Sequence, residues 1–258
     1  MRDAMPPMPG YESARVLRRL GAGPLADSWL VAHAEQQLVV RQDRPRAARI
    51  GLDRDGEFRV LRAAHRHGLA PEPLAWEPQR RVLVTRFLPG ESWDRQDGGV
   101  PADPWRRLGA LLRRVHALAP GGLPRFRPAM VLEDYARAAG TRDARAMARD
   151  LAGRSEGLYH EAPWVLCHHD PHLGNVIGEP GVLIDWEYAA LGHPLFDLAF
   201  VIEYHGLDDA AGSALLAGWA GQSPAVSLDK LEDFREFVAG INDLWALAVN
   251  SGDEQPGD

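Results

Sequence analysis

The N-terminal part of the chain alternates short apolar runs with polar or glycine-containing turns. Residues 15–20, 28–32 and 37–41 are rich in valine and leucine and are separated by such turns, which is typical of short β-strands. Two further runs, at residues 73–76 and 81–87, have the same character. The pattern therefore predicts a small sheet in this part of the chain.

A helical period interrupts this series of strands. Phe58, Leu61 and Ala64 recur at the spacing that places side chains on one face of a helix. Asp53 is suited to cap the first turn, because its carboxylate can accept a hydrogen bond from a free backbone N–H, and Gly68 ends the period. The sequence thus predicts one helix within the strand-rich part.

The pattern changes after residues 88–90, where Leu-Pro-Gly indicates a connector. Beyond it the pattern is helical over most of the remaining length. Asp103 and Pro104 predict the N-cap and the first residue of the next helix. One face of that helix is apolar and consists of Trp105, Leu108, Leu111, Leu112, Val115 and Leu118. We therefore place a boundary between residues 88 and 89.

Short strands return in the second half of the chain. Apolar and β-branched residues cluster at residues 164–167, 175–177 and 182–185, which predicts three strands. The Glu-Pro-Gly sequence at residues 179–181 supplies a turn between the last two of them. These two strands should form a hairpin.

This hairpin brings polar side chains together. If it is centred on Pro180, Asn175 lies opposite Asp185 at its open end, and Asp170 on the preceding loop lies within reach of the same point. Amide and carboxylate oxygens are hard ligands that favour Mg²⁺ at a site open to water and phosphate. Phosphoryl transfer needs a carboxylate to accept the proton of an attacking hydroxyl and a metal to bridge phosphate oxygens. The three side chains are therefore candidates for a phosphate-transfer site.

Composition and charge narrow the class of partner. The chain has 258 residues, of which 45% are hydrophobic, and this is enough for a substantial core. Its 29 basic and 36 acidic residues give a formal charge of −7. Such a net negative charge does not favour binding to nucleic acid or to an anionic membrane. A small or cationic partner suits this charge better.

The sequence also indicates in which cellular compartment the protein is expected. Cys167 is the only cysteine, so no intramolecular disulfide can form. Residues 1–10 contain three prolines and no apolar signal-peptide core, and the sequence contains no run of eighteen apolar residues. We therefore expect a cytoplasmic protein without a membrane-spanning segment.

Three segments in order carry a family resemblance. The first is His168-x-Asp170-x-x-x-x-Asn175, the second is Ile-Asp-Trp-Glu-Tyr-Ala at residues 184–189, and the third is Pro-Leu-Phe-Asp-Leu-Ala at residues 194–199. At these residues the chain resembles the family of choline kinases, thiamine kinases and aminoglycoside phosphotransferases, which are relatives of the protein kinases. The resemblance implies a phosphotransferase with ATP as the donor and Mg²⁺ as the cofactor.

The resemblance also implies roles for the matched residues and a fold. Asp170 would be the catalytic carboxylate, Asn175 would act in the same catalytic loop, and Asn175 and Asp185 would hold Mg²⁺. His168 would organise the loop rather than transfer a proton. The implied fold is α+β and two-lobed: a small antiparallel β-sheet with one helix binds the nucleotide over residues 1–88, and a larger, mainly helical lobe over residues 89–258 carries catalysis and the acceptor.

A glycine-containing turn matches the phosphate-covering hairpin of the family. Gly21 and Gly23 lie between two predicted strands, and glycine lets backbone approach phosphates closely. Family members commonly have a polar pair where this chain has Leu25 and Ala26. This departure leaves mainly backbone contacts to the phosphates.

Further residues on the predicted nucleotide-binding side of the fold match the family. Arg41 corresponds to the cationic strand residue that meets the α- and β-phosphates, and Glu57 corresponds to its partner on the helix. An arginine can engage phosphate or carboxylate through two parallel hydrogen bonds. Thr85 and Phe87 lie on the strand whose backbone would bind the adenine edge. No G-x-x-x-x-G-K-[ST] loop is present, so a P-loop kinase is not a competing interpretation.

On the predicted acceptor-binding side, the sequence matches the family less closely. Glu203 and Tyr204 lie near the position where choline kinases carry a substrate-facing acid beside an aromatic residue, although the spacing from Asp197 is one residue shorter. Tyr204, Trp219 and Trp245 could present aromatic faces to a quaternary nitrogen, each worth roughly 0.5 to 2 kcal/mol. We therefore expect a small cationic alcohol, choline-like or thiamine-like, as the acceptor.

Other functions are compatible with parts of the pattern. An aminoglycoside or a sugar could be the acceptor, and the altered turn at Leu25 and Ala26 is compatible with a non-catalytic ATP-binding protein. The residues Cys167, His168, His169, Asp170, His172 and His193 crowd a short stretch, as in zinc-dependent hydrolases. Consecutive histidines on an extended segment point to opposite faces, which disfavours the hydrolase.

Overall fold

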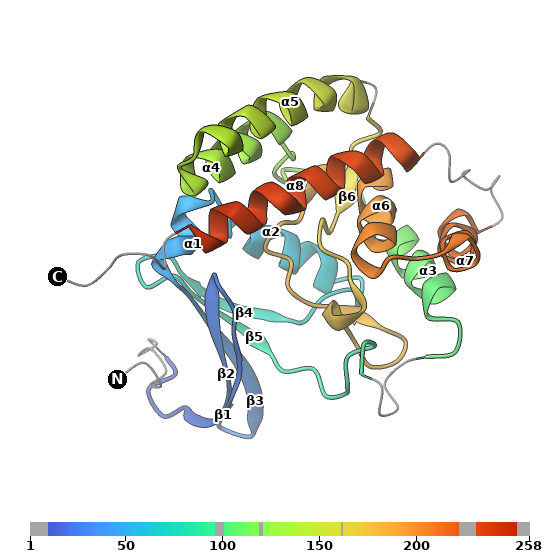
Figure 1. Ribbon diagram of the computed structural model, residues 1–258. Coiled ribbons are helices and arrows are strands. Elements are labelled where there is room, and N and C mark those ends of the chain that lie inside the picture. Colours follow the sequence, from blue (N-terminus) through green and yellow to red (C-terminus); the bar gives the residue numbers. More distant parts are fainter. Residues whose placement is uncertain (1–9, 96–100, 119–120, 161, 222–230, 252–258) are drawn as a thin grey trace.

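The computed structural model describes residues 10–95, 101–118, 121–160, 162–221 and 231–251 (Figure 1). Its main sheet is antiparallel, with the strands in the order β1-β2-β3-β5-β4. The strands are β1 (Arg15–Ala22), β2 (Ala26–His33), β3 (Gln36–Asp43), β4 (Pro73–Glu77) and β5 (Val82–Arg86). All five lie close to the ranges predicted from the sequence, and the predicted small antiparallel sheet is confirmed.

One face of this sheet has a small core of its own. It consists of Trp29, Val31, Leu38, Val40, Val82 and Val84, all of them buried. Within each of the three central strands the two contributing residues are two positions apart, as expected for side chains that share one face of a strand. The alternation seen in the sequence thus has its physical cause in this core.

Two helices accompany the sheet, where one was predicted. The predicted helix is α2 (Arg54–His65), and the side chain of its N-cap Asp53 accepts a hydrogen bond from the Gly56 N–H at 2.8 Å. A short helix α1 (Pro45–Arg49) precedes it. The prediction of a single helix is corrected here: Pro45 occupies the first helical turn, and Ala47 is fully buried, so packing stabilises a helix too short for a periodic signal.

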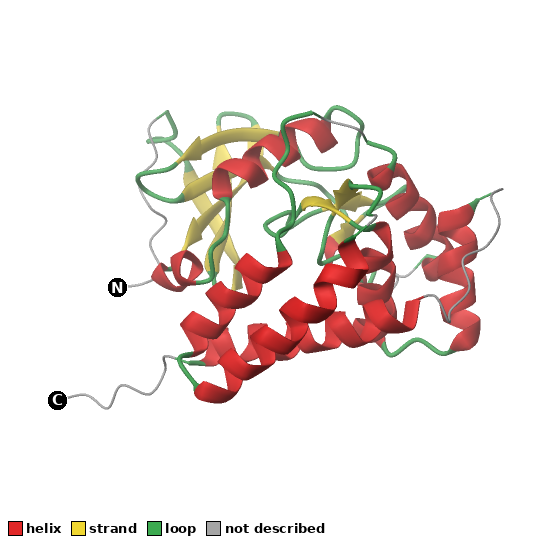
Figure 2. Cartoon of the chain, turned by 90° about the horizontal axis from the view of Figure 1, so that it is seen from above, coloured by secondary structure: helices red, strands yellow, loops and turns green. Residues whose placement is uncertain are grey.

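The rest of the described chain is mainly helical, as expected, and Figure 2 shows the sheet at one end of the molecule. Its helices are α3 (Pro104–His116), α4 (Pro128–Ala139), α5 (Arg142–Tyr159), α6 (Pro194–His205), α7 (Asp209–Ala220) and α8 (Glu232–Asn250). Helix α8 packs against α4, α5 and α6. Helices α3 and α7 approach closely at Gly109 and Gly218, where a Cβ atom would collide with backbone oxygens of the facing helix.

Short strands and one turn of 3-10 helix carry the predicted catalytic segment. Strand β6 (Val165–Cys167) pairs with β9 (Ala190–Gly192), and strand β7 (Val176–Ile177) pairs with β8 (Val182–Leu183). The 3-10 turn η1 (Leu173–Asn175) lies between β6 and β7.

The register of the β7–β8 hairpin corrects a prediction. Val176 faces Leu183 and Ile177 faces Val182, so the hairpin is centred one half-residue before Pro180 rather than on it. Asn175 ends the 3-10 turn instead of starting a strand, and its carbonyl accepts a hydrogen bond from the Ile184 N–H at 2.9 Å. Asn175 therefore lies beside residue 184 rather than directly opposite Asp185.

The sheet-bearing part and the helical part share a core. Val60, Leu61 and Leu83 from the first part belong to the same buried cluster as Leu108 and Val201 from the second. The division of the chain at residue 88 stays a prediction. None of the helices in the described ranges is long and apolar enough to cross a membrane.

Candidate active site

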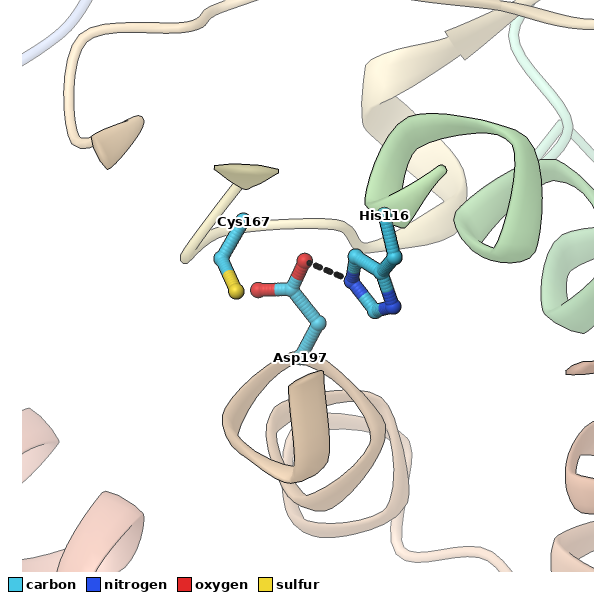
Figure 3. Close-up of side chains that lie close together, drawn as sticks. All are labelled: His116, Cys167 and Asp197. Carbon is cyan, nitrogen blue, oxygen red and sulfur yellow. Dashed lines mark hydrogen bonds and ion pairs between the residues drawn. The ribbon is translucent and has the colours of Figure 1, made fainter. Parts of the chain in front are cut away.

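A buried carboxylate anchors the loop that carries Asp170. Asp197, near the start of α6, accepts hydrogen bonds at 2.8 Å from the backbone N–H groups of His168 and His169. It also accepts one from Nε2 of His116 at 3.0 Å (Figure 3). Burial opposes the charge of Asp197, but the hydrogen bonds from His116 and from the backbone outweigh burial, so the pKa of Asp197 is lowered. The loop is thus fixed by an ionised group that is inaccessible to solvent.

The tautomer of His116 follows from its second contact. The Trp219 indole N–H donates to Nδ1 of His116 at 2.8 Å, so Nδ1 must be the acceptor nitrogen and Nε2 carries the proton. This arrangement presents an N–H to Asp197. Trp219 is therefore engaged in positioning the loop and does not line the cavity beside Asp170 that is described below.

His168 has the organising position that was expected of it. Its ring is fully buried against Trp186, and Nε2 lies 3.0 Å from the carbonyl oxygen of Ile184. Burial lowers its pKa to about 4, so the ring is neutral at neutral pH. The contact connects the loop before Asp170 to the residue just before Asp185.

Asp170 and Asn175 are in direct contact. Nδ2 of Asn175 donates to Oδ2 of Asp170 at 3.1 Å and to the Asp170 carbonyl at 3.0 Å. Burial raises the pKa of Asp170 well above its usual range, and the charges of Asp185 and Glu187 raise it further, while the Asn175 hydrogen bond opposes this. Asp170 is therefore a strongly basic carboxylate. Both hydrogen bonds use the amide nitrogen of Asn175, so its amide oxygen is left as a potential ligand.

Asp185 lies at the exposed edge of this group. Its side chain is 43% exposed, and its backbone has φ of 61°, an uncommon conformation for a residue with a Cβ. Oδ1 of Asp185 accepts a hydrogen bond from Arg41 at 3.2 Å. The structure therefore brings the predicted cationic strand residue to the predicted metal ligand.

A network of buried ion pairs extends from Arg41. Both oxygens of Glu57 accept from Nη2 of Arg41, at 2.7 and 2.6 Å. Arg54 donates to both oxygens of Asp43 and, through Nη1, to Glu57 and Glu187 at 2.8 Å each. Burial disfavours the charge of Arg54, but Glu57, Glu187 and Asp43 more than compensate and raise its pKa. These ion pairs thus join strand β3, helix α2 and the segment after β8.

Glu187 belongs to the network of ion pairs and also lines the cavity beside Asp170. Burial raises its pKa to about 7, with a further contribution from Asp185, while Arg41 and Arg54 oppose the rise. The sequence motif contained Glu187, but neither it nor Arg54 was given a role. The spacing of Arg54 and Glu57, one helical turn apart on a predicted helix, was the available signal for Arg54.

In the hairpin of β1 and β2, Gly21 belongs to strand β1 and pairs with Ser28 rather than lying between the strands as predicted, while Gly23 lies in the turn. Apart from its chain neighbours, no heavy atom lies within 4 Å of the position that a Cβ of Gly21 would occupy, and the Gly23 N–H donates to the Ala26 carbonyl at 3.0 Å. Leu25 is only 3% exposed and packs with Ile50, which accounts for an apolar residue where the family has a polar one. The turn is held by apolar packing.

The two residues predicted at the adenine edge lie at the end of β5 or beyond it. Thr85 is buried and pairs with Val39 and Pro73 across the sheet. The Phe87 N–H donates to the Gln37 carbonyl at 3.0 Å, so it is not free for a base. Their contacts with adenine stay predictions.

A cavity of about 860 Å³ opens beside Asp170. Its walls come from the segment before α2, the segment before α4, the catalytic loop and the helices α4, α6 and α8. Its aromatic lining residues are Phe126, Tyr135, Tyr188, Phe196, Phe200, Tyr204 and Trp245, and its acidic ones are Asp53, Asp134, Asp170 and Glu187. Tyr204 and Trp245 therefore line the cavity beside Asp170, and their contact with an acceptor stays a prediction.

Glu203 does not reach this cavity. It is not among the lining residues, and its carboxylate accepts a hydrogen bond from Nε of Arg235 at 2.5 Å. Neighbouring residues on a helix point in different directions, so the presence of Tyr204 in the wall turns Glu203 away. The expectation that Glu203 faces the acceptor is corrected accordingly.

The histidine-rich stretch does not form the metal site that a hydrolase would need. Within the described ranges one group of three potential ligands lies close together, His116, Cys167 and Asp197, with ligand atoms within 4.8 Å of one another. Figure 3 shows that the carboxylate of this group faces the His116 ring, and its oxygens are already engaged by three donors. The rings of His168 and His169 pack against different partners, Trp186 and Phe126 respectively.

The chain belongs to the phosphotransferase enzyme family, whose sequence profile matches residues 16–234. A search among curated proteins found no match. The family assignment confirms the resemblance that the three sequence segments indicated.

Solved structures share the fold. A choline/ethanolamine kinase family protein from Mesorhizobium loti is 21% identical, with a TM-score of 0.71 over 93% of this chain and 82% of that one. The choline kinase LicA from Streptococcus pneumoniae is 18% identical, with a TM-score of 0.72 over 94% and 89% of the two chains. An aminoglycoside-3'-phosphotransferase of type VIII is 21% identical, with a TM-score of 0.64 over 88% and 93%. The kinase-like architecture is thus common to proteins with different acceptors.

Proposed function

We propose that this protein transfers the γ-phosphate of ATP to the hydroxyl of a small-molecule alcohol, with Asp170 as the base. The observation that carries the proposal is the contact between Asp170 and Asn175 at the wall of a large cavity, with Asp185 and Arg41 beside it. A half-buried carboxylate with a raised pKa is suited to accept the proton of an attacking hydroxyl. The family supports the reaction class.

Mg²⁺ fits the donor set. The charges of Asp185 and Glu187 raise the pKa of Asp170, the charge of Asp185 raises the pKa of Glu187, and a divalent cation would relieve this repulsion. Asp185 and the amide oxygen of Asn175 are the hard ligands that would hold it. When bound, the metal neutralises charge on the phosphate oxygens.

The nucleotide would lie between the sheet and Asp185. Backbone at Gly21 and Gly23 would cover the phosphates, while Arg41, held by Glu57, would pair with them. The adenine would meet the end of β5 near Thr85 and Phe87. LicA, which shares the fold, has a structure in complex with AMP. This arrangement corresponds to a nucleotide-binding lobe over residues 1–88 and an acceptor lobe over residues 89–258.

The acceptor would be a cationic alcohol, choline-like or thiamine-like. Seven aromatic residues and four carboxylates line the cavity together with Arg59, Arg125 and Arg127, and the aromatic faces and carboxylates are groups that attract organic cations. Several structural relatives are choline or ethanolamine kinases and others act on aminoglycosides, so aminoglycoside or sugar acceptors are the second candidates. We place the protein in the cytoplasm and assign it no nucleic acid or membrane partner.

An ATP-consumption assay across acceptors tests this function. The purified protein is incubated with ATP and Mg²⁺ and with choline, ethanolamine, thiamine, kanamycin or glucose, and the phosphorylated product is identified by mass spectrometry. We expect acceptor-dependent ATP consumption with a cationic alcohol. ATP binding without transfer to any acceptor would indicate the non-catalytic alternative, and turnover of only neutral sugars or aminoglycosides would contradict the acceptor class.

A further inference from the structure

The size of the acceptor cavity is informative. Pockets of roughly 300 to 1,000 Å³ enclose drug-sized ligands, and this cavity, at about 860 Å³, lies near the upper end. It extends from Asp170 to residues 50–53 beside α1 and to residues 122–127 before α4. A compact amino alcohol such as choline would fill only a small part of it.

One wall of the cavity is a stack of rings. His172 and Tyr204 are nearly parallel, with centroids 4.7 Å apart and an angle of 12° between the planes. Phe200 continues the stack on the other side of Tyr204, at 5.5 Å and 17°. All three residues line the cavity. A planar ring can pack against such a stack in the offset or edge-on geometries that aromatic groups favour.

Two uncharged polar side chains face the same space. Tyr135 and Asn242 line the cavity, and no hydrogen bond joins either side chain to any of the described residues. The oxygen of Tyr135 is not sealed from solvent, although the residue as a whole is only 4% exposed. Binding sites use such groups to read heteroatoms of a ligand.

Two residues that the sequence suggested as partners of a compact quaternary cation do not line the cavity. Glu203 pairs with Arg235 outside the cavity, and the indole N–H of Trp219 is committed to His116. The acids that do line the cavity are partly engaged: Asp134 pairs with Arg137, and Glu187 pairs with Arg54.

From this geometry we propose that the acceptor is a drug-sized alcohol whose hydroxyl is carried on a planar, heteroatom-bearing ring system, and that compact amino alcohols are poor acceptors. The proposal rests on the proposed function and narrows its acceptor class. The hydroxyl would reach Asp170, the ring system would lie against the His172–Tyr204–Phe200 stack, and Tyr135 and Asn242 would hydrogen-bond to ring heteroatoms.

The first test measures binding without nucleotide. Isothermal titration calorimetry compares planar probes (thiamine, hydroxyethyl-pyridinium and hydroxyethyl-imidazolium) with choline, ethanolamine and kanamycin. At least one planar probe should bind tenfold or more tightly than choline. If choline or kanamycin binds as tightly as every planar probe, the proposal is overturned.

A second test fills the cavity from helix α8. Ala246 lines the cavity, and Ala246→Phe should weaken binding of the planar probe by at least tenfold. Leu247 is next to it on the same helix, is 44% exposed and is not part of the lining, so Leu247→Phe is the matched control and should leave binding unchanged. Equal effects of the two substitutions would contradict the assignment of the cavity as the acceptor site.

A third test removes one phenol hydroxyl with little effect on folding. Tyr135→Phe should weaken binding of the planar probe by about fivefold to tenfold, the effect of one lost hydrogen bond, with the KM for ATP unchanged. The hydroxyl of Tyr159 is buried without a partner outside the cavity, so Tyr159→Phe is the control and should have no effect on binding. Unchanged affinity in Tyr135→Phe would remove Tyr135 from the proposal.

The two proposals fail in distinguishable ways. If a planar probe binds as predicted but no phosphate is transferred to any hydroxyl, the phosphotransferase function is wrong while the shape of the site stands. If choline is phosphorylated efficiently and no planar probe binds, the function stands and the narrower acceptor class is wrong.

Discussion

Arg54 of helix α2 donates a hydrogen bond to Glu187 at 2.8 Å and so joins this helix to the segment that carries Asp185. The same guanidinium also pairs with Asp43 and Glu57, and the side chains of Arg54, Asp43 and Glu57 are each 5% exposed or less. A single cation thus serves three carboxylates from three separate segments. The pairing places Glu57, the partner of Arg41, in a fixed position relative to the catalytic segment.

Replacing Arg54 should destabilise the protein strongly. Arg54→Gln leaves buried carboxylates without their cation, which costs about 3 to 5 kcal/mol. Urea unfolding followed by fluorescence measures this loss, with Arg62→Gln as the control, because Arg62 is an exposed residue of the same helix and its loss should cost no more than about 0.5 kcal/mol. Equal stability of the two variants would show that the network contributes little.

Asp197, which accepts hydrogen bonds from the loop before Asp170, leads to a prediction that compares the cost in stability of two substitutions. Asp197→Ala leaves the N–H groups of His168 and His169 buried without an acceptor, and each such group costs about 1 to 3 kcal/mol. We expect a loss of at least about 3 kcal/mol in thermal or chemical unfolding. Asp208→Ala, which removes only the N-cap of α7, should cost about 1 kcal/mol. A smaller loss for Asp197→Ala than for Asp208→Ala would contradict the anchoring role.

The stability of the protein should depend on the protonation of His169. Burial lowers its pKa from 6.5 to about 4, and its ring lies between Phe126 and Phe196 with both nitrogens unpartnered. Because the folded pKa is the lower one, the unfolded state takes up the proton first as the pH falls. The stability conferred by the neutral ring is complete above pH 6.5 and is lost as the pH falls toward 4.

A variant isolates this contribution from other titrating groups. His169→Phe has nothing to protonate and preserves the ring packing. Relative to wild type, its free energy of unfolding should rise by about 2 to 3 kcal/mol between pH 7 and pH 4. Chemical unfolding at several pH values measures the difference. A difference that stays constant with pH would show that folding does not lower the pKa of His169.

The contact between Arg41 and Asp185 leads to a prediction about the metal. Asp185→Ala should raise the Mg²⁺ concentration needed for ATP binding by about tenfold or more, because a carboxylate ligand is lost. Nucleotide titrations at increasing Mg²⁺ measure this, and Asp243→Ala, at an exposed position of α8, is the control. An unchanged Mg²⁺ requirement would remove Asp185 from the metal site.

The sequence predicted the sheet well because its strands bury one face. Val31, Val40 and Val84 repeat the alternation that a half-buried strand imposes, and this signal is local. Helix α1 was missed because one buried residue in five, Ala47, produces no period. The half-residue error in the β7–β8 hairpin arose because turn geometry, which sets register, is not fixed by the presence of Pro180 alone.

The site was predicted in part. Asp170 and Asn175 lie within one motif and Asp185 lies in the next, and the Asp170–Asn175 contact is local in sequence. The positions of Arg54 relative to Glu187 and of Tyr135 in the cavity depend on packing between distant segments, for which no spacing in the sequence gives a signal. Glu203 was misplaced because one residue along a helix changes the direction of a side chain by about 100°.

The most direct test of the central claim is the effect of Asp170→Ala on transfer and on nucleotide binding, measured on the same preparation. With the acceptor that supports turnover, the rate of phosphate transfer should fall by about 10² to 10⁴-fold, while the Kd for ATP in the presence of Mg²⁺ should change by no more than about threefold. Transfer at the wild-type rate in this variant would contradict the account.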